Sequence, residues 1–194
     1  MKTTKSGINP YLEKMRAEKI VQFVCFETPL DSEEFILQWE QFDKSVNSEM
    51  DVTLQQSEKN GTFKYIAQHR YVASDTAFAF TKAKKSSRMP EIPIRVKQAG
   101  GYSMLQAERN DDARENENKL FAFIIDPTAD LDDYKNAAAP GKLNIYEAYY
   151  ENCQFAYVLE FFVSKNKAAS LLEQVRSYHP DEVGIYKDCV LQPA

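Results

Sequence analysis

Apolar and aromatic residues in the first part of this chain fall into runs of strand length, separated by turn signals. The stretch Ile20–Glu27 (IVQFVCFE) is rich in β-branched and aromatic residues, which is typical of a strand. Two more strands are expected over 51–56 and 62–72. The Asn60-Gly61 pair between them is a strong hairpin signal, so we expect these two strands to pair.

A helix is expected directly after the first strand. Asp31 is placed to cap it, Glu34 three residues later completes a capping box, and Leu30 with Phe35 supplies the matching hydrophobic staple. Apolar residues then recur at helical spacing, which predicts one apolar face. The residues of this face are Phe35, Trp39, Phe42 and Val46.

A second helix and a fourth strand complete this half of the chain. The helix is expected over 74–85, because Pro90 and Pro93 prevent it from continuing. The strand is expected over 94–108, with a bulge at Gly100-Gly101.

The rest of the chain repeats the same order of elements. Strands are expected over 120–125, 143–150, 155–163 and 183–191. A short or irregular helix is expected near 131–138, and a longer one over 167–178. The longer helix places its apolar residues on one side. They are Ala168, Leu171, Leu172, Val175 and Tyr178.

Two pairs of matching stretches support an internal repeat. KNGTFKYI (59–66) resembles ENCQFAYV (151–158), and FVCFETPLDSEEF (23–35) resembles FAFIIDPTADLDDY (121–134). Both pairs occur in the same order and are offset by more than 90 residues. In this alignment His69 corresponds to Phe161.

The element order in each half is β-α-β-β-α-β, the ferredoxin-like unit. Such a unit leaves one sheet face bare, and two units can bury both bare faces against each other. The fold class is therefore predicted as α+β, with two tandem ferredoxin-like βαββαβ units packed sheet to sheet as a pseudo-dimeric α/β barrel. The expected division is an N-terminal arm (1–19), a first half (20–108), a charged linker (109–118) and a second half (119–194).

The third strand carries the first candidate site, because its side chains alternate between two faces. Phe63, Tyr65, Ala67, His69 and Tyr71 share one face, which is expected to lie under the helices and to meet Trp39 and Phe42. A neutral imidazole beside phenols can stack on a flat aromatic ligand or accept a proton from it. The alternative is a partly buried structural histidine, since Phe161 fills the equivalent position.

The opposite face of the same strand carries Gln68 and Arg70. Glu160 also points away from the helices, toward the interface between the sheets, where it is expected to form a polar pair with these two residues. We interpret this pair as structural rather than catalytic. His179, directly after the last helix, is expected to interact with the carbonyls at its C-terminus.

Composition narrows the function classes. The formal net charge of −5 argues against a nucleic-acid partner, and no apolar run approaches the length of a membrane span. The basic, polar N-terminus does not resemble a signal peptide. Cys25, Cys153 and Cys189 have no metal-site spacing and are interpreted as reduced thiols, so the protein is expected to be cytoplasmic and to bind no metal.

The first half resembles the antibiotic biosynthesis monooxygenase family of the dimeric α/β-barrel superfamily. The residues that carry the resemblance are Glu33-Glu34-Phe35, Trp39, Phe63-Lys64-Tyr65-Ile66 and the stretch Ser74–Phe78. The resemblance implies kinship with cofactor-independent oxygenases of polycyclic phenols, haem-degrading enzymes and many proteins without known activity. Active members often carry Asn where this chain has Ala67, and Trp where it has Tyr71.

Two functions follow as hypotheses. The first is a non-catalytic module that binds a small apolar or aromatic ligand without a cofactor. The alternative is a cofactor-independent monooxygenase acting on an aromatic or polyphenolic substrate. Either would use Trp39, Tyr65, His69 and Tyr71. The chain is expected to be a monomer, as a pseudo-dimer, or a homodimer.

Overall fold

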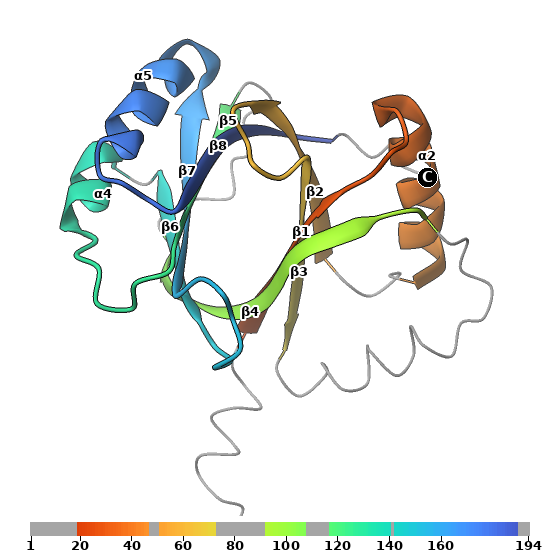
Figure 1. The fold of residues 1–194 in the computed structure, drawn as a ribbon, viewed down its shortest axis with the longest axis horizontal. Helices are drawn as coiled ribbons and strands as arrows, with labels where there is room; N and C mark the ends of the chain where they lie inside the picture. The colour runs from red at the N-terminus through yellow and green to blue at the C-terminus, as the bar shows by residue number, and fades with distance from the viewer. Residues whose placement is uncertain (1–18, 47–50, 73–91, 108–116, 141, 190–194) are drawn as a thin grey trace, which may run out of the picture.

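Antiparallel strands close into a barrel in a computed structural model of the chain (Figure 1). The structure describes residues 19–46, 51–72, 92–107, 117–140 and 142–189. The strands follow the order β1-β3-β2-β8-β5-β7-β6-β4, and β4 pairs back with β1. Helix α2 lies outside the barrel on one side, and α4 and α5 lie outside it on the other (Figure 1). The chain is therefore an α+β protein.

The first half contains the four predicted strands and the first predicted helix. Their bounds are β1 (Lys19–Glu27), α2 (Ser32–Val46), β2 (Asp51–Lys59), β3 (Tyr65–Val72) and β4 (Arg95–Ala107). The hairpin turn is confirmed, because β2 pairs with β3 and Asn60 between them has φ 58°. The predicted helix over 74–85 lies outside the described residues.

The second half also has the predicted order. Its elements are β5 (Glu117–Ile124), α4 (Asp132–Ala137), β6 (Leu143–Ala148), β7 (Tyr157–Ser164), α5 (Lys165–Arg176) and β8 (Glu182–Asp188). Strand β5 begins inside the segment predicted as a linker; the part of that linker over 109–116 and the N-terminal arm over 1–18 lie outside the described residues.

Helix α2 begins as its sequence predicts. The Asp31 carboxylate accepts a hydrogen bond from the Glu34 amide at 2.9 Å, so it satisfies one of the free N–H groups of the first turn. Leu30 packs with Phe35 in the same apolar cluster, as expected of a staple.

The two halves have equivalent strand orders and share their edges. The first half runs β4-β1-β3-β2, and the second runs β8-β5-β7-β6. The predicted packing of two separate sheets face to face differs from the structure: the strands form one continuous closed barrel, because the sheet edges pair, β2 with β8 and β4 with β6. An unpaired edge leaves a row of free N–H and C=O groups, and closure of the barrel satisfies them.

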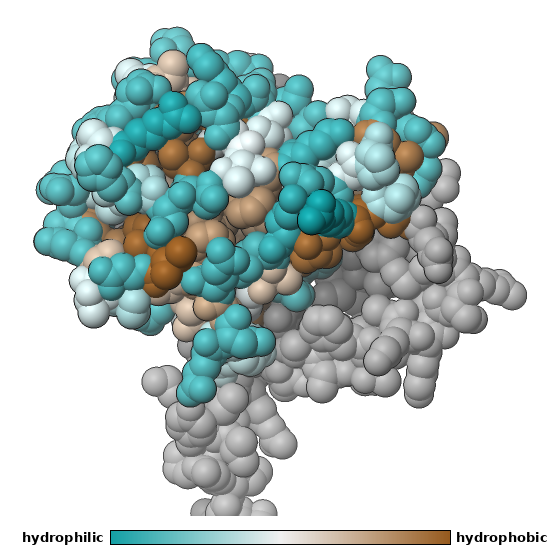
Figure 2. All heavy atoms as spheres, in the orientation of Figure 1, coloured by the Kyte–Doolittle hydropathy of each residue, from teal (hydrophilic) through white to brown (hydrophobic). Residues whose placement is uncertain are grey.

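Among the described residues, the apolar side chains form three cores. One fills the barrel and draws on both halves, with Phe23, Phe63, Phe121 and Phe155 among its members. A second lies between α2 and the outer face of β3, around Tyr65 and Trp39. The third lies between α4, α5 and the outer face of the second half. The outward side of α5 is correspondingly hydrophilic (Figure 2).

Two sequence predictions about the strands are wrong: the direction of the Phe63 side chain and the position of a bulge in β4. Phe63 lies inside the barrel and not under the helices, because β3 begins only at Tyr65 and alternation does not extend before it. Gly100 and Gly101 pair regularly with β1, and the bulges of β4 lie elsewhere. The two glycines instead leave space for neighbours, since a Cβ on Gly101 would lie 2.6 Å from the Tyr150 ring.

Candidate functional site

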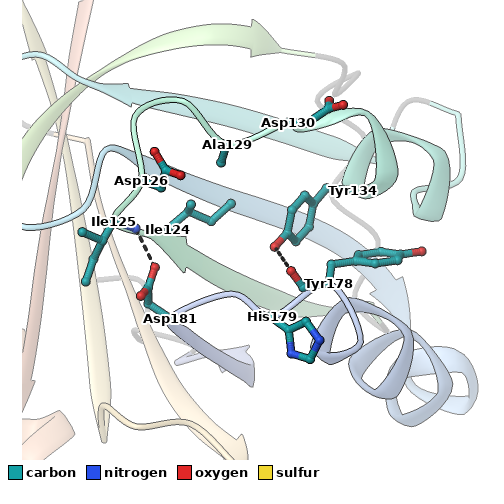
Figure 3. A pocket seen from close by; sticks show the side chains of 9 residues that line it. All are labelled: Ile124, Ile125, Asp126, Ala129, Asp130, Tyr134, Tyr178, His179 and Asp181. Carbon is teal, nitrogen blue, oxygen red and sulfur yellow. Dashed lines mark hydrogen bonds between the residues drawn. The ribbon is translucent and has the colours of Figure 1, made fainter.

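A pocket of about 450 Å³ opens in the second half, where the end of β5, the loop after it, α4 and the turn after α5 meet (Figure 3). We call it the tyrosine pocket. Its lining consists of Ile124, Ile125, Asp126, Ala129, Asp130, Tyr134, Tyr178, His179 and Asp181. Its lining therefore combines apolar side chains with two phenols, one imidazole and three carboxylates.

The two tyrosines hold α4 against the end of α5. Tyr134 is buried and donates a hydrogen bond from its hydroxyl to the Tyr178 carbonyl at 3.1 Å. The two rings meet edge to face, with centroids 5.3 Å apart. Burial raises the pKa of Tyr134, and the nearby Asp181 and Asp133 carboxylates raise it further. The Tyr134 wall is thus a neutral phenol in a fixed orientation.

The carboxylates are held by local hydrogen bonds. Asp126 accepts bonds through Oδ1 from the Thr128 amide and hydroxyl, at 2.8 and 2.7 Å. These bonds lower the pKa of Asp126, so its carboxylate is ionised at neutral pH. Asp181 accepts the Ile125 amide through Oδ2 at 2.6 Å, which ties the start of β8 to the end of β5.

His179 stands at the rim of this pocket (Figure 3). Its φ is 57°, and its backbone amide donates to the Arg176 carbonyl at 3.0 Å. The residue therefore does close the last turn of α5, as the sequence suggested, although the bond that shows this comes from its backbone and not from its imidazole.

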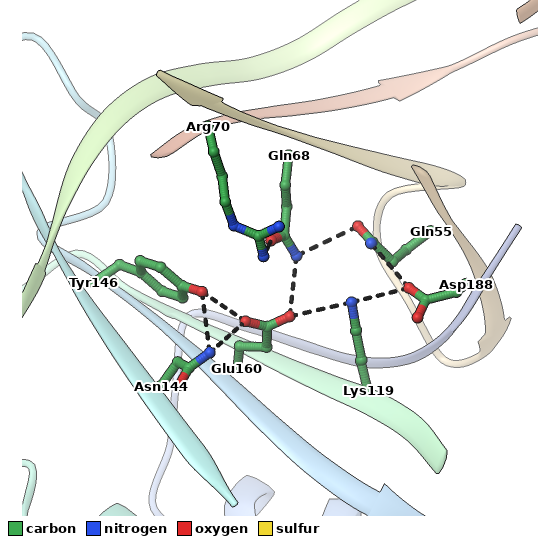
Figure 4. Close-up of polar contacts among 8 residues, drawn as sticks. All are labelled: Gln55, Gln68, Arg70, Lys119, Asn144, Tyr146, Glu160 and Asp188. Carbon is green, nitrogen blue, oxygen red and sulfur yellow. Dashed lines mark hydrogen bonds and ion pairs between the residues drawn. The ribbon is translucent and has the colours of Figure 1, made fainter. Parts of the chain in front are cut away.

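A second polar cluster occupies the barrel interior (Figure 4). The Glu160 carboxylate is fully buried and accepts bonds from Gln68 (3.1 Å), Asn144 (3.1 Å) and Tyr146 (2.6 Å). The Lys119 ammonium lies 3.4 Å from it and 2.9 Å from Asp188. This confirms the predicted pairing of Glu160 with Gln68.

Arg70 joins the same cluster through Gln68, to whose carbonyl oxygen it donates at 3.3 Å. Burial alone would raise the pKa of Glu160, but Lys119 and the three hydrogen bonds outweigh it and lower that pKa. Burial, and then the charge of Glu160, raise the pKa of Tyr146 well above its ordinary value. The interior therefore holds an ionised carboxylate whose two oxygens are both occupied by donors.

The residues proposed from the sequence as ligand contacts lie as follows. Trp39 and Tyr65 are buried, and Phe26 stacks on both rings with centroid distances of 5.6 Å. Phe35 packs against Tyr65 at 4.4 Å. His69 is half-buried on the outward face of β3, opposite Gln22 and Val52. The Tyr71 side chain and that of Phe42 lie outside the described residues.

The use of Trp39, Tyr65, His69 and Tyr71 as a ligand site stays a prediction from the sequence. Within the described part of the chain, no three His, Cys, Asp or Glu side chains are grouped to hold a metal ion. The cysteines at 25, 153 and 189 are free thiols, as predicted. Among the described helices, none is long and apolar enough to cross a membrane.

Sequence reasoning missed the tyrosine pocket. Its lining comes from two segments about 50 residues apart along the chain, 124–134 and 178–181. The only local signal is the density of acidic residues between β5 and α4, which is also typical of an exposed loop. The pairing of β5 with β8 is what brings the segments together.

Comparisons with known proteins give a fold and no family. No protein-family model matches the sequence, and no curated protein matches it. Solved structures of chlorite dismutase from Candidatus Nitrospira defluvii do share the fold. An arginine-to-lysine variant has a TM-score of 0.58 at 10% identity, covering 93% of this chain and 96% of that chain.

Two ligand complexes of the same dismutase give similar values. A tryptophan-to-phenylalanine variant with cyanide has a TM-score of 0.58 at 10% identity, over 92% of this chain and 95% of that one. The imidazole complex has a TM-score of 0.57 at 10% identity, over 93% and 96%. The chain therefore has a chlorite dismutase-like barrel fold.

Proposed function

We propose that this chain is a non-catalytic small-molecule-binding protein, built from two tandem ferredoxin-like units, and that it binds its ligand in the tyrosine pocket. The observation that carries the proposal is the pocket itself. Its volume of about 450 Å³ falls within the range of about 300–1,000 Å³ for small-molecule sites. The lining also places polar groups beside apolar side chains, and a few polar groups that fix the orientation of a ligand are typical of such sites.

The tandem arrangement is supported by equivalent positions in the two halves. Phe63 and Phe155, which match in the internal repeat, both lie in the barrel core. Gln68 and Glu160 also match, and they meet at the barrel centre. Each half also has the same strand order, with the middle strands of one half matching those of the other. Duplication of one unit explains all three observations.

The interior cluster supports a binding rather than a catalytic role. A general base needs a free lone pair within reach of the proton that it removes. Both oxygens of Glu160 already accept hydrogen bonds, and Lys119 neutralises its charge. This cluster therefore stabilises the barrel and offers no free base. The likeness to chlorite dismutase, at 10% identity, carries over the fold alone.

A fragment screen by amide NMR tests the proposal. Fragments that bind should shift the Ile125 and Asp181 amides, which flank the pocket. In Ala129→Phe the new ring should fill the pocket and abolish these shifts. The matched control is Ala139→Phe, at an exposed position that does not line the pocket. If no fragment shifts these amides, or if Ala129→Phe binds as well as the control, the proposal is wrong.

A cofactor-independent monooxygenase acting on an aromatic or polyphenolic substrate is the second candidate. The observation in its favour is that Trp39 and Tyr65 share one cluster on the side of β3 that also carries His69. Against it, Phe26 occupies a face of both rings, which a stacked substrate would need. Oxygen uptake with a polycyclic phenol, abolished in His69→Phe, would establish this activity in place of the first candidate.

A further inference from the structure

We infer that Asn60 is a site of spontaneous deamidation, and that isoaspartate formed there opens the pairing of β2 with β8, which we call the β2–β8 seam. This inference is independent of the tyrosine pocket. Asn60 is exposed in the turn between β2 and β3, and Gly61 follows it directly. No other asparagine in the sequence is followed by a glycine.

The reaction needs only these two residues and water. A hydroxide ion removes the proton of the Gly61 amide, and the nitrogen attacks Cγ of Asn60. A carbon–nitrogen bond forms, the bond to the side-chain nitrogen breaks, and ammonia leaves with a proton from water, which restores the hydroxide. Water then opens the five-membered imide: attack on the side-chain carbonyl gives aspartate, and attack on the main-chain carbonyl gives isoaspartate, whose backbone runs through Cβ. Glycine favours the first step because no Cβ obstructs its nitrogen.

The packing of the turn requires glycine at the second position of this pair. A Cβ on Gly61 would lie 2.5 Å from Ser57 Oγ and 2.7 Å from the Tyr186 hydroxyl oxygen. Asn60 has φ 58°, in the left-handed region where asparagine and glycine are favoured. Backbone geometry and packing therefore favour the same residue pair that is prone to deamidation.

The anchoring of the turn on β8 makes isoaspartate disruptive. Lys59, directly before Asn60, pairs with Ile185, and Gly61, directly after it, packs against Gly184. Isoaspartate adds one carbon to the backbone between these two contacts, so both cannot keep their positions on β8. Aspartate leaves the backbone length unchanged and adds only a charge at an exposed position.

Ageing of the full chain tests the modification and contains its own control. The internal repeat places Asn152 at the position equivalent to Asn60, but the next residue there is Cys153. Both asparagines are exposed. The protein is kept in a mildly alkaline buffer, and its peptides are followed by mass spectrometry with electron-transfer fragmentation, which distinguishes isoaspartate from aspartate. We expect Asn60 to deamidate at least about tenfold faster than Asn152, because Cys153 has the Cβ that glycine lacks. Similar rates at the two positions would overturn the inference.

Hydrogen exchange of the aged protein tests the effect on the seam. In the isolated isoaspartate form, the backbone amides of β2 and β8 should exchange at least about tenfold faster than in fresh protein, and those of β6 and β7 by no more than about twofold faster. Exchange that is unchanged in β2 and β8, or equally faster in all four strands, would contradict an opening at this seam.

Two variants separate the possible causes. Asn60→Gly has no side-chain amide and suits the positive φ, so its seam amides should keep their protection on ageing. Asn60→Asp has the new charge on a backbone of normal length, and its freshly prepared form should exchange within about twofold of the unchanged protein. The inference fails if aged Asn60→Gly loses as much protection as the aged unchanged protein, or if fresh Asn60→Asp exchanges as fast as the isoaspartate form.

Discussion

Glu160 is the residue on which the barrel interior depends. It is fully buried, and its carboxylate joins side chains from β3, β5 and β6 through Gln68, Lys119, Asn144 and Tyr146 (Figure 4). A buried ion pair adds little net stability over a well-packed apolar pair, but removal of one partner leaves the other charged and unpaired. The contribution of Glu160 to the free energy of unfolding should therefore be measurable in a variant whose side chain is neutral.

Glu160→Gln should destabilise the protein strongly. Lys119 would keep only Asp188 as a charged partner, and the Tyr146 hydroxyl would lose an ionised acceptor. We expect the free energy of unfolding to fall by about 3 kcal/mol, measured by urea denaturation at neutral pH. Glu173→Gln, in an exposed pair with Arg176 on α5, is the control and should cost less than about 1 kcal/mol. Equal losses in the two variants would contradict the structural role of the cluster.

The lowered pKa of Glu160 makes stability depend on pH in a defined direction. The folded carboxylate binds a proton less tightly than the unfolded one, whose pKa is near 4.5. Its contribution is therefore complete above about pH 4.5 and is lost as the pH falls through the lower folded pKa. Urea denaturation of the unchanged protein and of Glu160→Gln should converge as the pH falls below 4.5. A constant gap between them down to strongly acidic pH would show that this pKa is not lowered.

At the scale of elements, the turn between β2 and β3 packs directly against β8. A Cβ added to Gly184 in β8 would lie 2.4 Å from the Cα of Gly61 in that turn. The obstacle is backbone, which cannot rotate aside. Close approach of these two glycines is thus a condition for the β2–β8 seam that joins the halves.

Gly184→Ala should therefore cost about 2–3 kcal/mol of unfolding free energy, as overpacking does in a rigid setting. Gly101→Ala is the comparison, because its new methyl would meet the Tyr150 ring at 2.6 Å, and a side chain that is 38% exposed can shift more easily than backbone. We expect that second variant to lose less than half as much, by thermal or urea denaturation. Similar costs would mean that the β2–β3 turn yields as easily as an exposed side chain.

For the whole molecule, closure of the barrel should make the two halves unfold together. They share two hydrogen-bonded seams, an interior apolar core and the Glu160 cluster. Trp39 is the one tryptophan and reports only on the first half, whereas the Leu172 methyls report on the core beneath α5. We expect Trp39 fluorescence and Leu172 NMR signals to follow one urea transition with the same midpoint. Separate midpoints would show that the halves are independent folding units.

Local order could be read directly from the residues. The capped start of α2, the Asn60-Gly61 turn, the apolar side of α5 and the alternation along β3 from Tyr65 onward all depend on neighbours within a few positions. Short-range hydrogen bonding and side-chain period are enough to specify such features. The pairing of Glu160 with Gln68 could also be anticipated, because alternation along each strand placed both on the inward face.

Closure of the barrel and the position of the tyrosine pocket were decided by tertiary structure. The residues in and around β2 and β8 do not predict that the edges of these strands will pair, because the two strands are far apart along the chain. Phe63 points into the barrel because β3 begins only after it, at Tyr65. Gly101 does not form the predicted bulge; its missing side chain leaves room for the Tyr150 ring. The pocket exists only where 124–134 and 178–181 meet, since a cavity is a property of surfaces brought together and not of either surface alone.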